Sequence, residues 1–201
     1  MDAASLPLKK KSPRFRTALG YATDTYREKY ISREIKAKRL PENAHRIAAL
    51  VSLDAAADGD TAPLRFWQLF NVMGEKRIVA IVRNFYERVF SDPEEWFRRP
   101  FSDVAGIDHH VSTQSGMWCD VMGGGRYYHG GSYRLNFHHT HNAIKILNRK
   151  GAERWAGHMN ATLAGLTDVA PQVRECLVEF MRFFIDDYGN EFRFDAKNLF
   201  P

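Results

Sequence analysis

Apolar residues recur through residues 64–190 at the spacing that places them on one face of an α-helix. Residues 75–90 show this pattern most clearly, with an apolar face formed by Ile78, Ile81, Val82, Phe85 and Val89. The last long segment repeats the pattern with Val173, Leu177, Phe180, Phe184 and Tyr188. Because no segment shows convincing strand alternation, the sequence predicts an all-α fold with six or seven helices in this region.

The clearest boundary in the chain is the segment 54–63, DAAADGDTAP, which combines Gly, Asp and Pro. Before it, residues 1–16 are rich in Lys and contain two prolines, and residues 17–39 predict a polar helix. The segment ENAHRIAALVSL predicts a further, amphipathic helix. We therefore divide the chain into an N-terminal extension, 1–63, with a basic disordered tail and one or two helices, and a helical domain, 64–201.

The composition is that of a globular protein with many aromatic residues. The 201 residues include fourteen Phe, eight Tyr and four Trp, which supply apolar area to a core or to a flat ligand. The net charge of +5 is mild, and much of the excess lies in KKKSPRFR, residues 9–16. Short basic runs are usually solvated, so we expect neither a nucleic-acid partner nor a membrane partner.

The two cysteines indicate a reducing compartment. Cys119 and Cys176 lie far apart, in no metal-binding spacing, and each has apolar neighbours on a predicted helix. This argues against a disulfide scaffold and predicts two buried free thiols. The first residues contain no apolar signal region, and no stretch approaches the ~18 apolar residues of a membrane span. We therefore expect a cytoplasmic protein.

Several polar and aromatic residues occur at positions where a buried helix face would favour aliphatic ones. His110 and Gln114 are four residues apart and share a helix face, which continues into Trp118. Packing or surface exposure usually explains each such residue taken alone, so their order along the chain carries the argument. That ordered set is Tyr86, Phe101, His110, Gln114, Trp118, His141 and Trp155.

The ordered set resembles the truncated haemoglobins, the compact subfamily of the globins. The segment LFNVMGEKRIVAIVRNFYERVFSDPE resembles the first helix, glycine turn and FY-x-R-V segment of that family. SGMWCDVMGGG resembles the end of the distal helix, HNAIKI the proximal His with its apolar-x-Ile pattern, and ERWAGHMNATLAGL the helix that follows. The resemblance covers about residues 64–188 and implies the globin-like helical sandwich of the truncated haemoglobin type.

The resemblance implies a bound haem b, iron protoporphyrin IX, with His141 as the iron ligand. Tyr86, His110, Gln114 and Trp155 would line the distal side, with Phe101 against the porphyrin, and we place Trp118 among the cofactor-binding residues. Tyr, Trp, His and Gln side chains can all donate hydrogen bonds to a polarised diatomic ligand. Each such bond contributes ~1.5–3 kcal/mol, which suits retention of a gas or chemistry on it better than quick delivery.

The sequence departs from the family pattern in ways that leave alternatives open. The interval from His141 to Trp155 is about one residue longer than the commonest family spacing, which keeps His138 and His139 as competing iron ligands. His141 is favoured because Ile144 and Ile146 fit the motif only from there. His109 or His110 would bind the iron directly in a six-coordinate form. The distal residues mix features of different subclasses, so the subclass stays open.

The resemblance implies reversible binding of O2, NO and CO by a monomer or homodimer. NO dioxygenase or peroxidase-like chemistry would also need a reductase, and no catalytic residue is assigned. An alternative function is a haem-based gas sensor or interaction protein that signals through the N-terminal extension. Two further alternatives are a helical protein with a histidine-bound transition metal and a plain structural domain with no cofactor.

Overall fold

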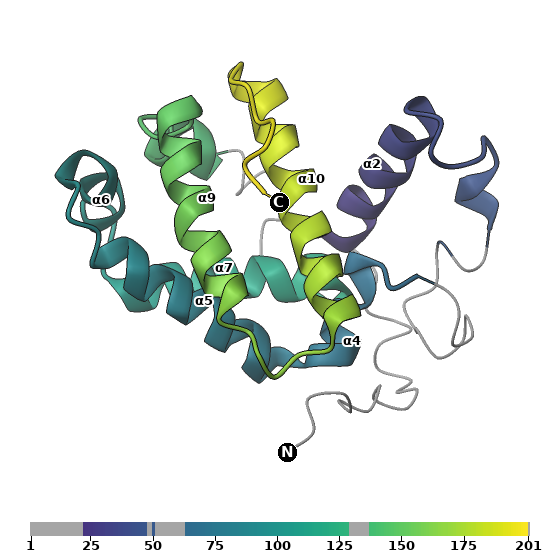
Figure 1. Ribbon diagram of the computed structural model, residues 1–201, viewed down its shortest axis with the longest axis horizontal. Coiled ribbons are helices and arrows are strands. Elements are labelled where there is room, and N and C mark those ends of the chain that lie inside the picture. The colour runs from purple at the N-terminus through teal and green to yellow at the C-terminus, as the bar shows by residue number, and fades with distance from the viewer. Residues whose placement is uncertain (1–21, 48–49, 51–62, 129–136, 201) are drawn as a thin grey trace.

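The computed structural model describes residues 22–47, 50, 63–128 and 137–200, and it contains no strand within these ranges (Figure 1). The all-α fold expected from the apolar pattern is therefore confirmed. The elements are α2 (Ala22–Lys36), η1 (Ala44–Arg46), η3 (Phe66–Gln68), α4 (Leu69–Met73), α5 (Glu75–Phe90), α6 (Glu95–Ser102), α7 (Ile107–Cys119), η4 (Asp120–Gly124), η5 (His138–Asn142), α9 (Arg149–Ala164) and α10 (Pro171–Phe192).

Two pairs of helices form the body of the molecule. Helices α9 and α10 stand beside each other across α5 and α7, which run underneath them (Figure 1). Helix α5 packs most extensively against α7 and also contacts α9. The apolar face expected for residues 75–90 is buried throughout, because it lies at this crossing. Large rings fill the rest of the core, among them Phe66, Trp67, Phe85, Phe97, Phe180 and Phe183.

Glycines set the directions of α5 and of the segment after α7. Gly74 has φ 76°, a left-handed conformation that favours glycine, and it separates α4 from α5. Gly123 (φ 87°) and Gly125 (φ 114°) end the helical run at η4, within the GGG of SGMWCDVMGGG. These turns fix where α5 begins and where the helical run that continues α7 ends.

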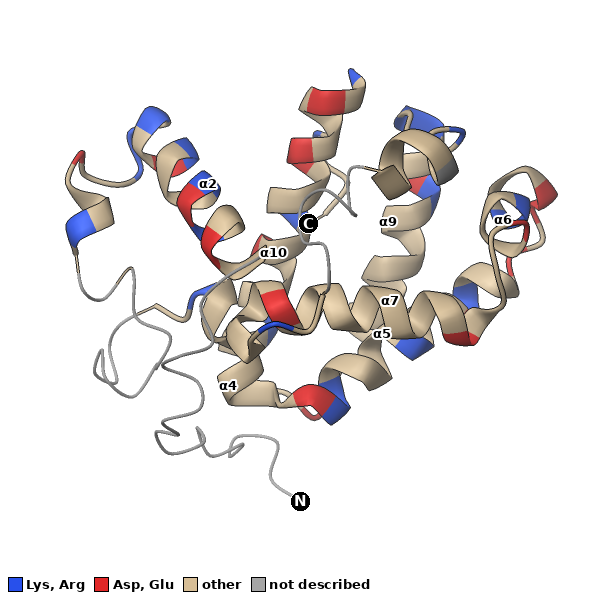
Figure 2. Ribbon diagram, turned by 180° about the vertical axis from the view of Figure 1, so that it is seen from behind, with Lys and Arg blue, Asp and Glu red and all other residues tan. Residues whose placement is uncertain are grey.

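The described part of the extension packs on the helical domain. The Asp120 carboxylate accepts hydrogen bonds from the backbone N–H groups of Ala22 and Thr23, 3.2 and 3.3 Å away, at the start of α2. The Tyr26 ring lies 4.7 Å from that of Phe184 on α10. Ion pairs between basic residues of α2 and acidic residues of α10 complete the contact, and Figure 2 shows both signs of charge along α2. The predicted polar helix in this region is thus a packed one.

Parts of the sequence-based account of the extension fall outside the described residues. These parts are the basic tail, 1–16, and nearly all of the boundary segment, 54–63. In the segment ENAHRIAALVSL, the described residues form the short turn η1, and residues 48–49 and 51–53 are not described. The division of the chain at residue 63 therefore stays a prediction.

Both cysteines are buried free thiols, as the sequence predicted. Burial raises the pKa of Cys119 to about 12, and burial also raises that of Cys176. Such thiols stay protonated at neutral pH and behave as small apolar side chains. Across the described ranges, no helix combines the length and the apolar character needed to cross a membrane.

Candidate functional site

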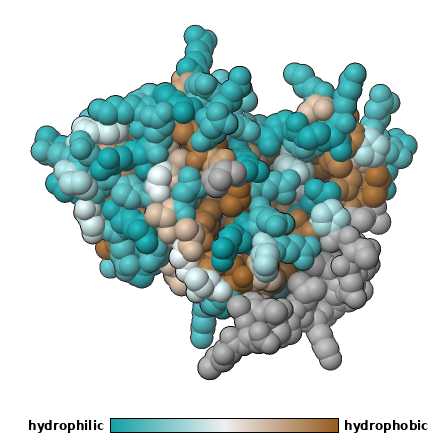
Figure 3. Space-filling view, viewed as in Figure 1, coloured by the Kyte–Doolittle hydropathy of each residue, from teal (hydrophilic) through white to brown (hydrophobic). Residues whose placement is uncertain are grey.

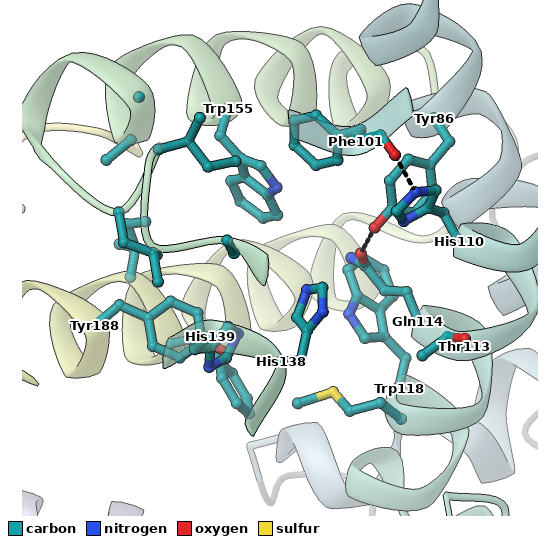
Figure 4. Close-up of a pocket in the computed structure, with 18 of the residues that line it drawn as sticks. Tyr86, Phe101, His110, Thr113, Gln114, Trp118, His138, His139, Trp155 and Tyr188 are labelled. Carbon is teal, nitrogen blue, oxygen red and sulfur yellow. Dashed lines mark hydrogen bonds between the residues drawn. The ribbon is translucent and has the colours of Figure 1, made fainter. Parts of the chain in front are cut away.

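A cavity of about 290 Å³ lies between α7, η5, α9 and α10 (Figure 4). This volume is at the lower end of the range usual for small-molecule sites, ~300–1,000 Å³. Viewed from the side shown in Figure 1, apolar residues are visible in the hollow between the α9 and α10 sides, with hydrophilic residues around it (Figure 3). Val104 and Phe137 line the cavity and are 38% and 50% exposed, so apolar side chains mark its mouth.

All six residues predicted to bind a cofactor line this one cavity. They come from four different helices, and most are buried. The structure therefore brings together residues that the sequence separates by up to about seventy positions. Their contact with a cofactor stays a prediction. The six are Tyr86, Phe101, His110, Gln114, Trp118 and Trp155.

One side of the cavity, here named the helical wall, consists of Tyr86 on α5 and His110, Gln114 and Trp118 on α7. The Tyr86 hydroxyl donates a hydrogen bond to Oε1 of Gln114, 2.5 Å away. Burial raises the pKa of Tyr86, so the hydroxyl stays protonated and keeps its donor role. Because this bond occupies Oε1, the NH2 group of Gln114 is left as the donor end of the amide.

His110 is held by the backbone. Its Nε2 lies 2.9 Å from the carbonyl oxygen of Phe101, which can only accept, so Nε2 carries the proton and donates. Burial lowers the pKa of His110, which favours the neutral ring. In that tautomer the remaining nitrogen, Nδ1, is an acceptor. His110 therefore fixes the backbone of Phe101 beside the cavity, and the His110 Nε2 is occupied by this hydrogen bond. His109, the other distal candidate, lines the cavity and is exposed.

Aromatic contacts hold the remaining predicted residues in place. The Trp155 ring lies 5.0 Å from that of Phe85, and the Trp118 ring meets Phe180 edge-on at 5.5 Å. Phe101 meets Phe97 edge-on at 5.3 Å, where α6 closes one end of the cavity. Each ring is thus supported from behind by another buried ring, a preferred geometry for aromatic pairs.

The opposite side, here named the turn wall, consists of His138, His139 and Ala143. Figure 4 shows the His138 ring projecting from η5 toward the helical wall. The turn has π-helical hydrogen bonding, since the Ala143 N–H donates to the His138 carbonyl oxygen at 3.1 Å. That pattern joins residues five apart by a backbone hydrogen bond. His138 and Ala143, which it joins here, both line the cavity.

The structure does not place His141 with the other predicted residues. His141 is exposed, its ring stacks on that of Phe137 at 4.1 Å, and its Nδ1 lies 3.1 Å from the Phe137 carbonyl oxygen. The physical reason is the π-helical turn, since positions 138 and 141 would share a face only with α-helical spacing. The assignment of His141 to the iron stays a prediction. In the described conformation, His141 does not line the cavity.

His139 is the most enclosed imidazole of the cluster, with 8% of its surface exposed. Its ring meets that of Tyr188 on α10 at 4.5 Å, and burial lowers the pKa of His139 to about 3. The ring is therefore neutral at any physiological pH. Burial raises the pKa of Tyr188, so its hydroxyl is neutral too.

The sequence did not identify the contribution of α10 to the cavity. Phe180, Phe184 and Tyr188 were predicted as one apolar face, but that pattern does not distinguish a ring at a cavity from a ring in a core. Phe194, beyond the end of α10, also lines the cavity and carried no signal in the sequence. Of the residues that the structure describes, no three His, Cys, Asp or Glu side chains come together as ligands for a metal ion.

The comparisons with known proteins agree with this geometry. A family model described as bacterial-like globin matches residues 68–189, well over half of the chain. The chain belongs to the bacterial-like globin family. Two-on-two hemoglobin-3 of Arabidopsis thaliana is 28% identical over 128 residues, 62% of this chain and 71% of the plant protein. Group 2 truncated hemoglobin 3-1 of Lotus japonicus is 28% identical over 145 residues, 71% of this globin and 80% of the relative.

The resemblance to the truncated haemoglobins is thereby confirmed. The match runs from the start of α4 through all but the last three residues of α10. The described residues outside it are those before position 68, which include α2 and η1, and those after position 189.

Proposed function

We propose that this bacterial-like globin binds haem b in the cavity and holds a diatomic gas, above all O2, beside the helical wall. The observation that carries the proposal is the pairing of two walls across one apolar cavity. One wall presents neutral hydrogen-bond donors, Tyr86 and Gln114, and the other presents imidazoles. When bound, haem supplies an iron with one coordination position open to the gas.

The residues around the cavity fit that group. A porphyrin needs flat apolar surroundings, and Phe101, Trp118 and Phe184 supply rings on different sides of the cavity. Ferrous haem iron in globins is held by a neutral imidazole. His138 and His139 offer imidazole rings at the turn wall, and burial keeps the His139 ring neutral. No described lysine or arginine lines the cavity to oppose a metal cation.

The helical wall would hold the gas by hydrogen bonding. The Tyr86 hydroxyl orients the Gln114 amide, and the apolar rings around the pair exclude water. In such a dry pocket a hydrogen bond to a polarised ligand is electrostatically stronger than in water. We assign Tyr86 and Gln114 to retention of the gas, with Trp155 closing the cavity from α9.

For the iron ligand we propose His141, as the resemblance implies, although His138 and His139 are the histidines of η5 that line the cavity. All three residues belong to η5. If η5 re-forms with α-helical hydrogen bonding when haem binds, His138 and His141 come to share one face, and His141 reaches the cavity. The proposal thus includes a rearrangement of one short turn. A ligand at His138 would require none.

The names of the two plant relatives, two-on-two and group 2 truncated hemoglobin, support placing this globin near that subclass. NO as a second ligand, NO dioxygenation or peroxidase-like turnover with a reductase, CO binding and a cytoplasmic location stay predictions. For the alternative of a gas sensor, the packing of α2 on α10 favours a structural role for the described part of the extension over a free signalling arm.

The test is a titration of the purified protein with haemin, followed by reduction and exposure to CO. We expect a sharp Soret band that saturates at one equivalent and shifts at each step. Ala143→Trp, which places a large ring at the turn wall, should abolish the band. Ala164→Trp adds the same ring at an exposed position on α9 and should not. A wild-type protein without a saturable band would contradict the proposal.

A further inference from the structure

The segment after α10 folds back against the helices instead of leading away from them. Arg193 has a left-handed backbone, φ 60°, and the Phe194 N–H donates to the Gly189 carbonyl oxygen at 3.0 Å, which reverses the chain. A Cβ atom at Gly189 would lie 2.8 Å from the Phe194 carbonyl oxygen and 2.9 Å from the Ala196 Cβ. The glycine therefore permits the close return of residues 193–200, here named the return segment.

Side chains of α9 anchor the return segment at both ends. The Arg149 guanidinium donates from Nη1 to the carbonyl oxygens of Asp195 and Lys197, at 2.7 and 2.9 Å. The Asn160 amide donates from Nδ2 to the Leu199 carbonyl oxygen at 2.8 Å. Figure 1 shows the segment descending between α9 and α10. Three hydrogen bonds from one helix thus fix its path.

The return segment lines the cavity at one residue and contacts a second lining residue from behind. Phe194 is one of the residues that line the cavity. Phe200 is 6% exposed, and its ring meets the Trp155 ring at 6.3 Å with an angle of 72°. Trp155 itself lies between Phe85 on one side and Phe200 on another. Removing Phe200 would leave the indole supported by Phe85 alone among the described rings that contact it.

We infer that the return segment forms part of the ligand cavity and that Phe200 is a positioning residue for Trp155. This inference rests on the proposed function, in which Trp155 closes the cavity beside the gas. The segment lies beyond the family match, which ends at residue 189. Through Phe200, the return segment sets the position of the Trp155 indole, which can donate a hydrogen bond from its ring N–H.

The test compares two identical substitutions of buried phenylalanines that each contact a tryptophan. Phe200→Leu acts on Trp155, and Phe66→Leu acts on Trp67, which does not line the cavity. Both should lower the thermal midpoint. Only Phe200→Leu should shift the C–O stretch of the ferrous CO form and change the CO dissociation rate, by about 2- to 30-fold.

A second variant tests the segment as a unit. Asn160→Ala removes the anchor at Leu199 without touching the cavity lining, and it should change CO dissociation in the same direction as Phe200→Leu. The double variant should show less than the sum of the two effects, because either change releases the same segment. Fully additive effects would overturn the inference.

A measurement without haem separates this inference from the proposed function. In the protein as purified without haem, Phe200→Leu should move the Trp155 indole N–H signal in the NMR spectrum, and Phe66→Leu should leave it in place. If the signal and the CO stretch both match the wild type while the thermal midpoint falls, the return segment is only structural. If the wild type takes up no haem, the proposed function fails, and the indole signal still decides the positioning.

Discussion

The two walls of the cavity differ in how firmly the chain determines them. The helical wall comes from α5 and α7, long regular helices whose crossing is buried on both sides. The turn wall comes from η5, a single turn with π-helical hydrogen bonds. On the helical wall, all four residues expected at the cavity are there, whereas on the turn wall the expected His141 points away. The direction of a side chain can thus be predicted from the sequence only where the type and register of its helix can be predicted.

The turn after α5, the helix that carries Tyr86, is anchored to α9 through Asp92, and loss of this anchor should be costly. Asp92 is buried and accepts two hydrogen bonds from Arg154, each of 2.7 Å, a third from His158 on α9, and one from the Glu94 N–H. Replacing Asp92 with Ala removes these charge-assisted hydrogen bonds, but the Arg154 side chain is 35% exposed and regains water, so we expect a loss of ~1.5–3 kcal/mol in the free energy of unfolding. Denaturant titration measures this.

The same anchor predicts a pH dependence. Burial disfavours the charged Asp92, but the hydrogen bonds from Arg154 and His158 outweigh it and hold its pKa far below the usual value. Because the folded-state pKa is depressed, this stabilisation is complete above the unfolded pKa of ~3.9 and is lost as the pH falls below it. Asp103→Ala, at an exposed carboxylate near Arg99, should cost at most ~1 kcal/mol. Equal losses for both variants would contradict the anchor.

A change in the rate of O2 dissociation should show whether the helical wall retains the gas. Tyr86→Phe removes the hydroxyl that orients Gln114, so we expect O2 to dissociate about 10- to 150-fold faster, equivalent to ~1.5–3 kcal/mol. Stopped-flow mixing of the oxygenated protein with CO gives this rate. Tyr30→Phe removes a hydroxyl that donates to Glu179 outside the cavity, and it should leave the rate unchanged. Unchanged release in Tyr86→Phe would remove the helical wall from gas retention.

The sequence predicted the long regular helices well and the short turns poorly. The 3.6-residue period located α5 and α10, and the i,i+4 spacing placed His110 and Gln114 on one face. The apolar segment 64–73 forms η3 followed by α4 and not one continuous helix. Short 3-10, α-helical and π-helical turns all bury apolar residues three to five positions apart, so the apolar pattern did not distinguish them.

Two features of the site had no local signal. The side-chain partners of Asp92, Arg154 and His158, lie more than sixty positions away, and their meeting depends on how α9 crosses α5. The return segment reaches Trp155 only because Gly189 permits a close reversal after α10. Neither contact follows from periodicity, because each depends on the packing of separate helices.

The most direct test of the account compares His138→Ala, His139→Ala and His141→Ala as haemin-reconstituted ferric, ferrous and ferrous CO forms. We expect His141→Ala to lose the ferrous spectrum of an imidazole-bound haem and to regain it with added imidazole. His138→Ala and His139→Ala should keep that spectrum. If His138→Ala alone loses the spectrum, the turn wall binds iron in its described conformation and the rearrangement of η5 is wrong. If all three variants keep it, no histidine of the cluster holds the iron, and the central claim fails.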